Sequence, residues 1–391
     1  MRLIYAITAA SFLFSCQSTH HADDLARKPQ TAPKAVFATE PMIKAGQEIT
    51  LAFVGDVILH ERLRNREEKH NEGYQTIWSN IQTYLDQADT TYANLEGPVA
   101  PEYGGVTGFP MFNYPEEIIP ALKENGFDIV STANNHALDR QAKGIKKTIE
   151  NLNKYNLAHT GTVISATNIE QGTETWWALT PVAGTSKSVA WLACTEMTNG
   201  NPDKENQVLY CFKDREKIKT FIQKLKSRSD IAAIILTPHW GEEEKFEIEP
   251  HVKTWGRMML DEGASAIVGS HPHVVRKIEE YTTKDQRRTL VAYSLGNFVS
   301  NQPWTPNKLA MLLYLKFKDN QDQKPYELKD IKYIGLWTTR TIEKDTTAKY
   351  RINAVWDAKK LPVEAEKILK EQLGNDLRIK SEAETKKFLN K

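Results

Sequence analysis

The feature that most constrains this chain is an alternation of short apolar runs with helical patterns over residues 48–298. The expected strands occupy residues 48–54, 91–95, 129–131, 231–236 and 264–268. Amphipathic helical patterns at residues 144–155 and 252–262 lie between them. Such alternation is typical of α/β proteins, which bind ligands beyond the carboxyl ends of their parallel strands. The sequence therefore predicts an α/β fold with a site at that edge.

Polar side chains that suit a metal ion follow each of these expected strands. They are Asp56, Glu96, Asn135, His239, His271 and His273. Carboxylate, amide and imidazole donors together suit divalent ions such as Mn, Fe or Zn, and the lack of a thiolate argues against a structural zinc site. Taken singly, each residue has an ordinary alternative as a cap, a turn residue or a packed histidine. Their recurrence at successive strand ends favours a metal centre of one or two ions.

The histidine turn after residues 264–268 carries His271 and His273 two positions apart. Side chains at i and i+2 lie on the same side of an extended chain, so both imidazoles can face one ligand. The alternative is two loop histidines without a common partner.

The order of the motifs resembles the CapA family of capsule-biosynthesis proteins. This family is associated with poly-γ-glutamate, is also called PgsA-like, and has a domain similar to calcineurin-like metallophosphoesterases. The motifs are Gly55-Asp56, Asn94-Leu95-Glu96, Asn134-Asn135-His136-Ala137-Leu138-Asp139, His239-Trp240-Gly241, His271-Pro272-His273-Val274 and Gly296-Asn297-Phe298. The resemblance covers roughly residues 48–300. It implies a layered α/β/β/α sandwich with a metal site at the strand carboxyl ends, and the patterns beyond residue 305 add C-terminal strands and helices.

The resemblance also implies roles for the site residues. Asp56 is the first carboxylate and Glu96 the bridging one, while Asn135, His239, His271 and His273 complete the metal ligands. His136 is implied as the general acid or as a clamp on the transition state. Asp139 either orients His136 or caps the helix that follows.

Several positions depart from the family pattern. Ile58 stands where a phosphoesterase has a histidine ligand, and His60 comes two places later. Gln141 stands where the family usually has glycine. Arg276 either meets an anionic substrate or lies on the surface, and Glu243 is either a supporting residue of the site or part of a solvated acidic run.

The function that the resemblance implies is a metal-dependent hydrolase of phosphoester type. Its substrate would be an anionic envelope polymer or a precursor of one. The alternative is a non-catalytic component that binds or exports the polymer of a poly-γ-glutamate capsule system. The sequence leaves open whether the protein is an enzyme, and it says nothing of the oligomeric state.

The N-terminus indicates export. Residues 3–14 are apolar, and the segment that ends at Cys16 resembles a lipoprotein signal, so acylation of Cys16 would anchor the chain in the lipid bilayer. A plain signal peptide is the alternative. The expected organisation is a signal peptide over residues 1–16, a tether over 17–47, the CapA-like metallophosphoesterase domain over 48–345 and a C-terminal extension over 346–391. We expect the cell envelope, at the outer membrane or cell surface.

The charge balance excludes one class of partner. The chain has 51 basic and 50 acidic side chains, so it offers no general electrostatic attraction for nucleic acid. Besides Cys16, the only cysteines are Cys194 and Cys211. In an oxidising compartment they can form a disulfide, and two unlinked buried thiols are the alternative.

Overall fold

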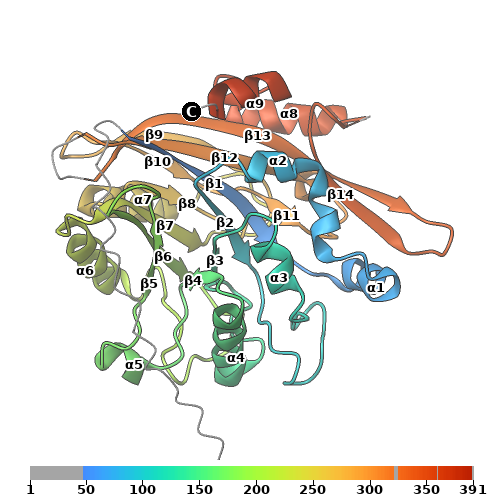
Figure 1. The fold of residues 1–391 in the computed structure, drawn as a ribbon, viewed down its shortest axis with the longest axis horizontal. Helices are drawn as coiled ribbons and strands as arrows, with labels where there is room; N and C mark the ends of the chain where they lie inside the picture. The colour runs from blue at the N-terminus through green and yellow to red at the C-terminus, as the bar shows by residue number, and fades with distance from the viewer. Residues whose placement is uncertain (1–46, 321–324, 359, 390–391) are drawn as a thin grey trace, which may run out of the picture. The chain divides into compact units, whose positions relative to one another are not determined.

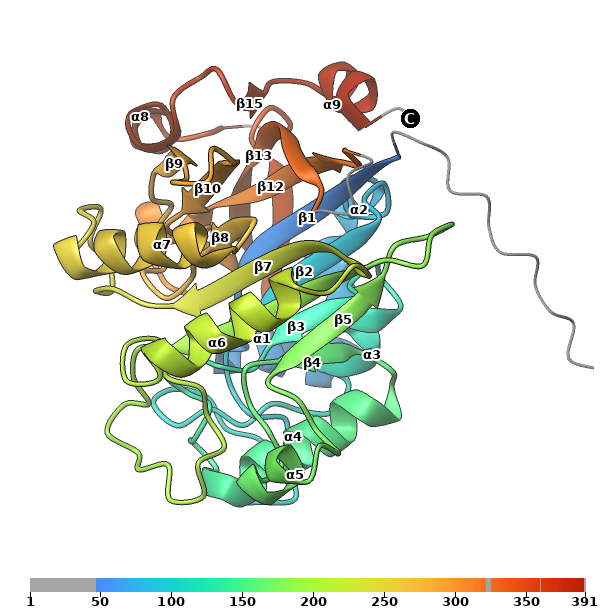
Figure 2. The same cartoon turned by 90° about the vertical axis from the view of Figure 1, so that its left-hand side faces the viewer.

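Two β-sheets pack face to face at the centre of the fold (Figures 1 and 2). The computed structural model describes residues 47–320, 325–358 and 360–389. Within these residues one sheet has nine strands and the other has six. Both sheets contain a parallel core, so each has an edge at which several strand carboxyl ends meet.

The nine-stranded sheet has the order β14-β13-β12-β1-β2-β3-β4, with β11 paired to β1 and β15 to β13. Strands β1 to β4 run parallel to one another, and β12 joins β1 antiparallel. The strands are β1 (Glu48–Val57), β2 (Thr90–Leu95), β3 (Ile129–Ser131), β4 (Ala158–Thr160), β11 (Asn297–Val299), β12 (Leu309–Lys318), β13 (Glu327–Ile342), β14 (Ala348–Ala354) and β15 (Arg378–Ile379).

The six-stranded sheet has the order β5-β6-β7-β8-β10-β9. Strands β6, β7, β8 and β10 are parallel, and β5 and β9 form antiparallel edges. The strands are β5 (Trp177–Pro181), β6 (Ser188–Thr195), β7 (Ile231–His239), β8 (Ala266–Val268), β9 (Ile278–Thr282) and β10 (Arg288–Ala292).

The alternation of side chains along each central strand serves two cores at once. In β1, Leu51 and Phe53 enter the core between the sheets, whereas Ala52 and Val54 enter the core on the outer face. Trp191 of β6 crosses the space between the sheets and lies 5.7 Å from Phe53, measured between ring centroids. These buried aromatic contacts set how the two sheets meet.

Helices cover both outer faces. Helices α6 (Arg215–Lys226) and α7 (Pro250–Glu262) pack on the six-stranded sheet, while α2 (Gln82–Leu85) and α3 (Ile118–Lys123) pack on the nine-stranded sheet (Figure 2). The remaining helices are α1 (Glu61–His70), α4 (Gln141–Lys154), α5 (Ala166–Glu170), α8 (Val363–Leu373) and α9 (Glu382–Leu389). The predicted fold class, a layered α/β/β/α sandwich with added C-terminal strands and helices, is confirmed.

Two helical segments differ from the pattern in the sequence. The apolar spacing over residues 77–85 suggests one helix, but the chain forms 3-10 turns at Tyr74–Ile77 and Ser79–Ile81 before α2. Trp78 has a non-helical backbone between the turns and is fully buried. The sequence of helix α1 shows no apolar periodicity, because Leu63 is its one hydrophobic residue.

The C-terminal residues belong to the same sheet as the rest of the domain. The boundary expected at residue 345 falls between β13 and β14, which pair with each other over seven positions. Helix α8 buries Ala365 and Leu369 in the core that also holds Tyr333 of β13. Residues 1–46, with the expected signal peptide and Cys16, lie outside the described residues. In the described part of the chain, each helix is too short or too polar to cross a bilayer.

Candidate metal centre

The carboxyl edges of the two sheets bring the predicted ligands together. Asp56 lies near the end of β1, Glu96 directly follows β2, and His239 ends β7. His271 and His273 follow β8, and Asn135 follows β3. All six side chains are buried, although each sits beside a turn.

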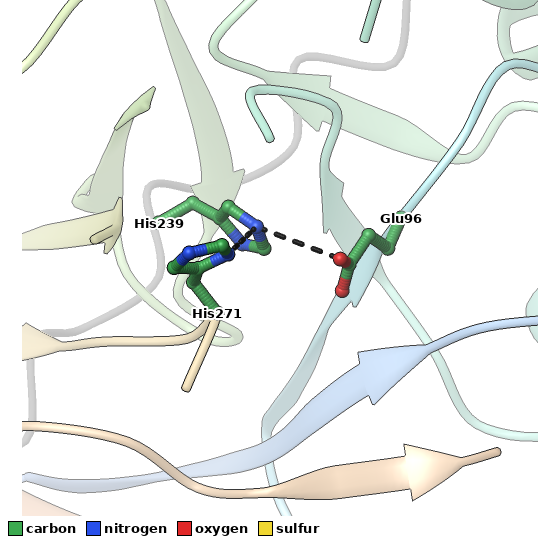
Figure 3. Close-up of side chains that lie close together, drawn as sticks. All are labelled: Glu96, His239 and His271. Atoms are coloured by element: carbon green, nitrogen blue, oxygen red, sulfur yellow. Dashed lines mark hydrogen bonds and ion pairs between the residues drawn. The ribbon is translucent and has the colours of Figure 1, made fainter. Parts of the chain in front are cut away.

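The first group of potential ligands contains Glu96, His239 and His271, with one donor atom of each within 4.8 Å of the others. Nε2 of His239 lies 3.1 Å from Nδ1 of His271 and 3.6 Å from a carboxylate oxygen of Glu96. Oδ1 of Asn135 is 3.1 Å from the same nitrogen. Figure 3 shows Glu96, His239 and His271 pointing toward one another.

The second group contains Asp56, Glu96 and His273. Nδ1 of His273 lies 3.1 Å from Oδ2 of Asp56, and Nε2 lies 3.7 Å from Oε1 of Glu96. Oδ1 of Asn297 adds an oxygen 3.0 Å from Nδ1 of His273. Glu96 belongs to both groups, so it has the position of a carboxylate shared by two adjacent cation sites.

The spacing of these donors fits divalent ions. A tetrahedral ion with bonds of about 2.1 Å keeps its ligand atoms about 3.4 Å apart, and the separations around His239 run from 3.1 to 3.6 Å. Burial and the neighbouring imidazoles lower the pKa of His239 well below its ordinary value. Burial and the charge of His273 lower the pKa of His271 to about 3. Both rings are therefore neutral at pH 7, which is the form that binds metals.

The second group has the opposite electrostatics. Burial lowers the pKa of His273, but the nearby carboxylates of Glu96 and Asp56 outweigh this effect and raise the pKa to about 9. Burial, reinforced by the negative charge of Asp56, raises the pKa of Glu96 well above its ordinary value. Protons thus stabilise a buried pair of carboxylates, and a divalent cation can replace them in that role.

The backbone at Gly55, His271 and His273 has unusual features that allow the donor side chains to converge. A Cβ atom on Gly55 would lie 1.8 Å from the carbonyl oxygen of Gly296, so only glycine lets β11 approach β1 beside Asp56. His271 and His273 have positive φ angles of 98° and 57°. Such a backbone is strained for residues other than glycine, and strain of this kind is concentrated at functional sites.

Two further asparagines, Asn94 and Asn297, contact the predicted ligands. Both of them stand in motifs of the sequence, but the sequence assigned them no role. Nδ2 of Asn94 donates to Asp56 at 2.8 Å and lies 3.3 Å from Nδ1 of His239. Asn297 faces His273, as described above. Asn94 lies near the carboxyl end of β2, as the predicted ligands lie at other strand ends, whereas Asn297 is the first residue of β11.

His136 and Asp139 form a pair beside the metal centre. Nδ1 of His136 lies 2.7 Å from Oδ2 of Asp139, which also accepts a hydrogen bond of 2.7 Å from the backbone N–H of Phe112. Helix α4 has Arg140 at its N-cap and no side-chain capping bond. Of the two roles considered for Asp139, the geometry therefore supports orientation of His136 over helix capping.

Arg276 requires a correction, because it is neither on the surface nor directed toward the donor cluster. Its side chain is fully buried and donates to Glu249 and to the backbone carbonyl groups of Glu242 and Lys245. The guanidinium therefore holds the segment that follows His239 and Gly241. A buried arginine with an internal carboxylate partner gives no separate signal in the sequence.

The structure also places the other residues that depart from the family pattern. Ile58 is buried in the outer core, and His60 accepts a hydrogen bond from the backbone N–H of Asn301. In the described residues, His60 joins none of the ligand groups. Gln141 has a positive φ of 55°, which explains why glycine suits that position. Glu243 is exposed, and one of its oxygens lies within 4.8 Å of donor atoms on His271 and His273.

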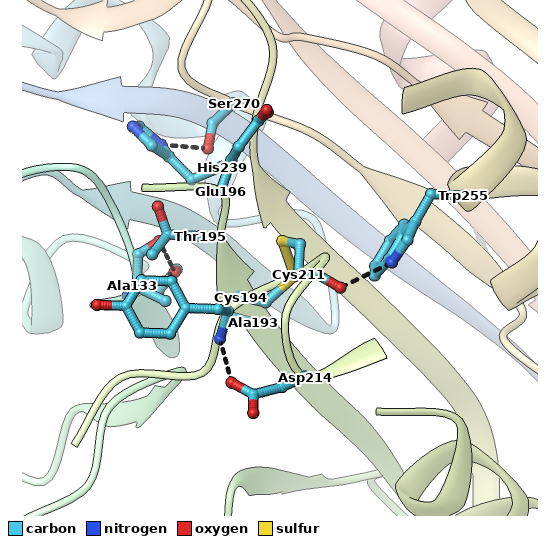
Figure 4. Close-up of a disulfide and its surroundings, with 12 residues drawn as sticks. Ala133, Ala193, Cys194, Thr195, Glu196, Cys211, Asp214, His239, Trp255 and Ser270 are labelled. Atoms are coloured by element: carbon cyan, nitrogen blue, oxygen red, sulfur yellow. Dashed lines mark hydrogen bonds between the residues drawn. A yellow bond between two sulfur atoms is a disulfide. The ribbon is translucent and has the colours of Figure 1, made fainter. Parts of the chain in front are cut away.

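Cys194 and Cys211 form a disulfide next to this site. Cys194 lies in β6, and the residue after it, Thr195, pairs with His239 in the sheet. Figure 4 shows the disulfide close to His239 and Ser270, whose hydroxyl lies 3.0 Å from Nδ1 of His239.

Comparison with known proteins places this chain in a family. The family described as "Bacterial capsule synthesis protein PGA_cap" matches residues 50–302. "Capsule biosynthesis protein CapA" of Bacillus anthracis is 28% identical over 284 residues, which cover 71% of this chain and 66% of that protein. "PGA biosynthesis protein CapA" of Bacillus subtilis (strain 168) is 28% identical over 288 residues, which cover 72% of each. The match thus spans slightly less than two thirds of the first of these relatives.

Two solved structures show a distant likeness to this chain. A hypothetical protein from Thermus thermophilus matches with a TM-score of 0.41 and 16% identity, over 73% of this chain and 98% of that one. The sulfate thiohydrolase SoxB of the same species matches with a TM-score of 0.39 and 12% identity, over 83% of this chain and 60% of that one. Likeness at this level says nothing about function.

Proposed function

The chain belongs to the bacterial capsule synthesis protein family, and we propose that it is a metal-dependent hydrolase of phosphoester type. Its substrate would be an anionic polymer of the cell envelope or a precursor of one. The observation that carries this proposal is the sharing of Glu96 between two groups of buried donors, one with His239 and His271 and the other with Asp56 and His273. Two adjacent cation positions are the arrangement that two-metal hydrolases use to hold the attacking and leaving oxygens.

The donor set would hold one or two divalent ions. Glu96, His239, His271 and Asn135 would bind one, and Glu96, Asp56 and His273 the other. Bound ions of this kind polarise a phosphoryl oxygen and lower the pKa of water, which permits hydrolysis near neutral pH.

His136 would act as the proton donor to the leaving group. Its Nδ1 is held by Asp139 at 2.7 Å, so Nε2 is the nitrogen that remains for proton transfer. Phe112 packs edge-on against the imidazole with ring centroids 4.6 Å apart and fixes its orientation. His136 is 6% exposed, which limits access of bulk water.

The proposed location is the cell envelope. Two relatives carry names that refer to capsule or PGA biosynthesis. Acylation at Cys16 would anchor the domain to the bilayer, with residues 17–47 as the tether. A Cys16→Ala variant is expected to leave the membrane fraction, and continued fractionation with membranes would contradict lipid anchoring.

The deciding experiment combines metal analysis with a panel of phosphoesters. Wild-type protein should contain divalent metal and hydrolyse at least one ester. His271→Ala and Asn135→Ala should lose turnover and contain less metal than the wild type, whereas His136→Ala should keep the full metal content and lose turnover. Wild-type metal content without any turnover, together with a defect in polymer binding in the His271→Ala variant, would instead favour a non-catalytic polymer-binding component.

A histidine outside the centre provides the matched control. His70 forms another group of potential ligands with Glu343 and Asp345. Arg66 already forms an ion pair with Glu343, and Lys69 forms one with Asp345, each with an N–O distance of 3.1 Å. His70→Ala should therefore keep wild-type metal content and turnover, and a fall in metal content in this variant would place an ion outside the proposed centre.

A further inference from the structure

The Cys194–Cys211 disulfide closes a loop over residues 195–210. This loop runs from His239, a proposed metal ligand, to His136, the proposed proton donor. At its base, Thr195 pairs with His239 and the backbone N–H of Glu196 donates to the His239 carbonyl group at 2.9 Å. The disulfide and a hydrogen bond from Cys211 N–H to the Thr195 carbonyl group close the loop beside that pairing (Figure 4). The base of the loop is therefore fixed relative to a proposed metal ligand.

The tip of the loop reaches His136. A tight turn over residues 198–201 is held by the Asn201 N–H, which donates to the Thr198 carbonyl group at 2.8 Å, and by the Thr198 hydroxyl, which donates to the Asn201 carbonyl group at 2.7 Å. At the corner of this turn is Asn199, whose amide Nδ2 lies 3.5 Å from Nε2 of His136. In the described part of the chain, this is the one hydrogen-bond contact of the Asn199 side chain.

The position of this amide matters because of the nitrogen that it faces. Nδ1 of His136 is engaged by Asp139, so Nε2 is the nitrogen that would meet the substrate. The Asn199 amide is exposed and makes a contact at the long limit of a hydrogen bond. An amide held loosely beside the reacting nitrogen can turn its N–H toward an incoming oxygen at little cost.

We propose that Asn199 contacts the substrate, donating a hydrogen bond from its amide to an anionic phosphoryl oxygen beside Nε2 of His136. This inference rests on the proposed function and adds a recognition residue from outside the six strand-end ligands. Hydrogen bonds to charged oxygens are about twice as strong as neutral ones, so a single amide can contribute measurably to anion affinity.

A simpler account is that the turn requires asparagine for its backbone alone. Asn199 has a φ of 50° and Gly200 a φ of 75°, and asparagine tolerates this left-handed region better than most residues. The same loop supplies a matched control in Asn206, which is also exposed and has a φ of 53°. Alanine at either position has a similar backbone cost, but of the two only Asn199 faces His136.

The experiment measures binding of inorganic phosphate to the metal-loaded protein by titration calorimetry, alongside turnover of a phosphoester. Asn199→Ala should weaken phosphate binding by at least about tenfold and raise KM more than it lowers kcat. Asn199→Gly, which suits the left-handed backbone, should show the same loss. Asn206→Ala should bind phosphate as the wild type does. Equal phosphate affinity in Asn199→Gly and wild type would overturn the inference.

The two readouts separate this inference from the proposed function. Turnover in the wild type with phosphate affinity independent of Asn199 would keep the hydrolase and remove the role of Asn199. Phosphate affinity that depends on Asn199, without turnover of any ester, would keep the anion contact and remove the hydrolase. A wild-type protein that binds no phosphate would overturn the role of Asn199 whatever its turnover.

Discussion

The two sheets contribute different chemistry to one site. The nine-stranded sheet and its turns supply the oxygen donors Asp56, Glu96 and Asn135, while the six-stranded sheet and its turns supply the three imidazoles His239, His271 and His273. Both of the ligand groups that contain Glu96 combine a carboxylate of the first sheet with an imidazole of the second. The proposed centre therefore depends on how the two sheets meet.

This division explains the electrostatics of the centre. The carboxylates of one sheet repel each other, and the imidazoles of the other sheet are kept neutral except His273, which faces both Asp56 and Glu96. At this contact, protons on Glu96 and His273 offset the negative charge of the carboxylates, and the proposed divalent cation would replace them. Variants that change the carboxylates of one sheet or the imidazoles of the other can test whether the site depends on both sheets.

The largest effect should come from Glu96, because it faces imidazoles of the other sheet in both ligand groups. Glu96→Gln keeps the shape but weakens both cation sites, so metal content should fall toward zero. Turnover of the best phosphoester should fall by about 1,000-fold, which corresponds to several kcal/mol of lost stabilisation. Mass spectrometry of bound metal and steady-state kinetics measure the two outcomes. Glu247→Gln, at an exposed position, is the matched control and should behave as the wild type does.

A comparison of His271→Ala with Asp56→Ala sharpens the contrast between the two groups. His271 belongs to the group with His239, and Asp56 belongs to the group with His273. If each group holds its own ion, each variant should keep about half of the wild-type metal, and the double variant should keep none. Complete loss of metal in either single variant would show that one ion, or a strictly coupled pair, occupies the centre.

The third prediction concerns the charges that face each other between the sheets when the metal has been removed. The pKa of His273 is raised from 6.5 to about 9 in the folded protein. Its contribution to stability is therefore fully present below pH 6.5 and is lost as the pH rises through 9, an effect of about 3 kcal/mol at most. The raised pKa of Glu96 acts in the same direction, because its protonated form is the favoured one in the folded state.

Urea unfolding of chelator-treated protein at pH 6.5 and pH 9.5 measures this change. The free energy of unfolding should be lower at pH 9.5, and His273→Gln should reduce the difference. Addition of a divalent metal should restore more stability at the higher pH, where fewer protons compete for the ligands. Equal stability of the metal-free protein at the two pH values would argue against charge pairing between the sheets.

The smallest effect should follow a change confined to the nine-stranded side. Asp139→Asn keeps an acceptor for the Phe112 N–H but weakens the hold on His136. Metal content should stay at the wild-type level while kcat falls by about 10- to 100-fold. Asp214→Asn is a control, because Asp214 accepts a backbone N–H from Tyr210 in a similar way without holding an imidazole. Loss of metal in Asp139→Asn would mean that the pair supports the ligands themselves.

Much of the fold and of the donor set is predictable from local patterns. The strand that leads to Asp56 and the helix that follows Asp139 can be recognised because apolar periodicity and glycine turns are local properties. Helix α1 was missed because a charged sequence with one buried apolar residue has no such periodicity. Arg276 was misplaced because its burial depends on Glu249, a partner 27 positions away.

The sequence by itself determined which donors stand at the strand ends and that they lie at the carboxyl edge of parallel sheets. Only the tertiary structure decided that Glu96 is shared, that His273 alone among the three ligand imidazoles has a raised pKa, and that Asn199 reaches His136. The reason is physical. A strand end is specified by its own neighbours, whereas distances between the two sheets depend on how buried side chains such as Phe53, Tyr92 and Trp191 pack across the core.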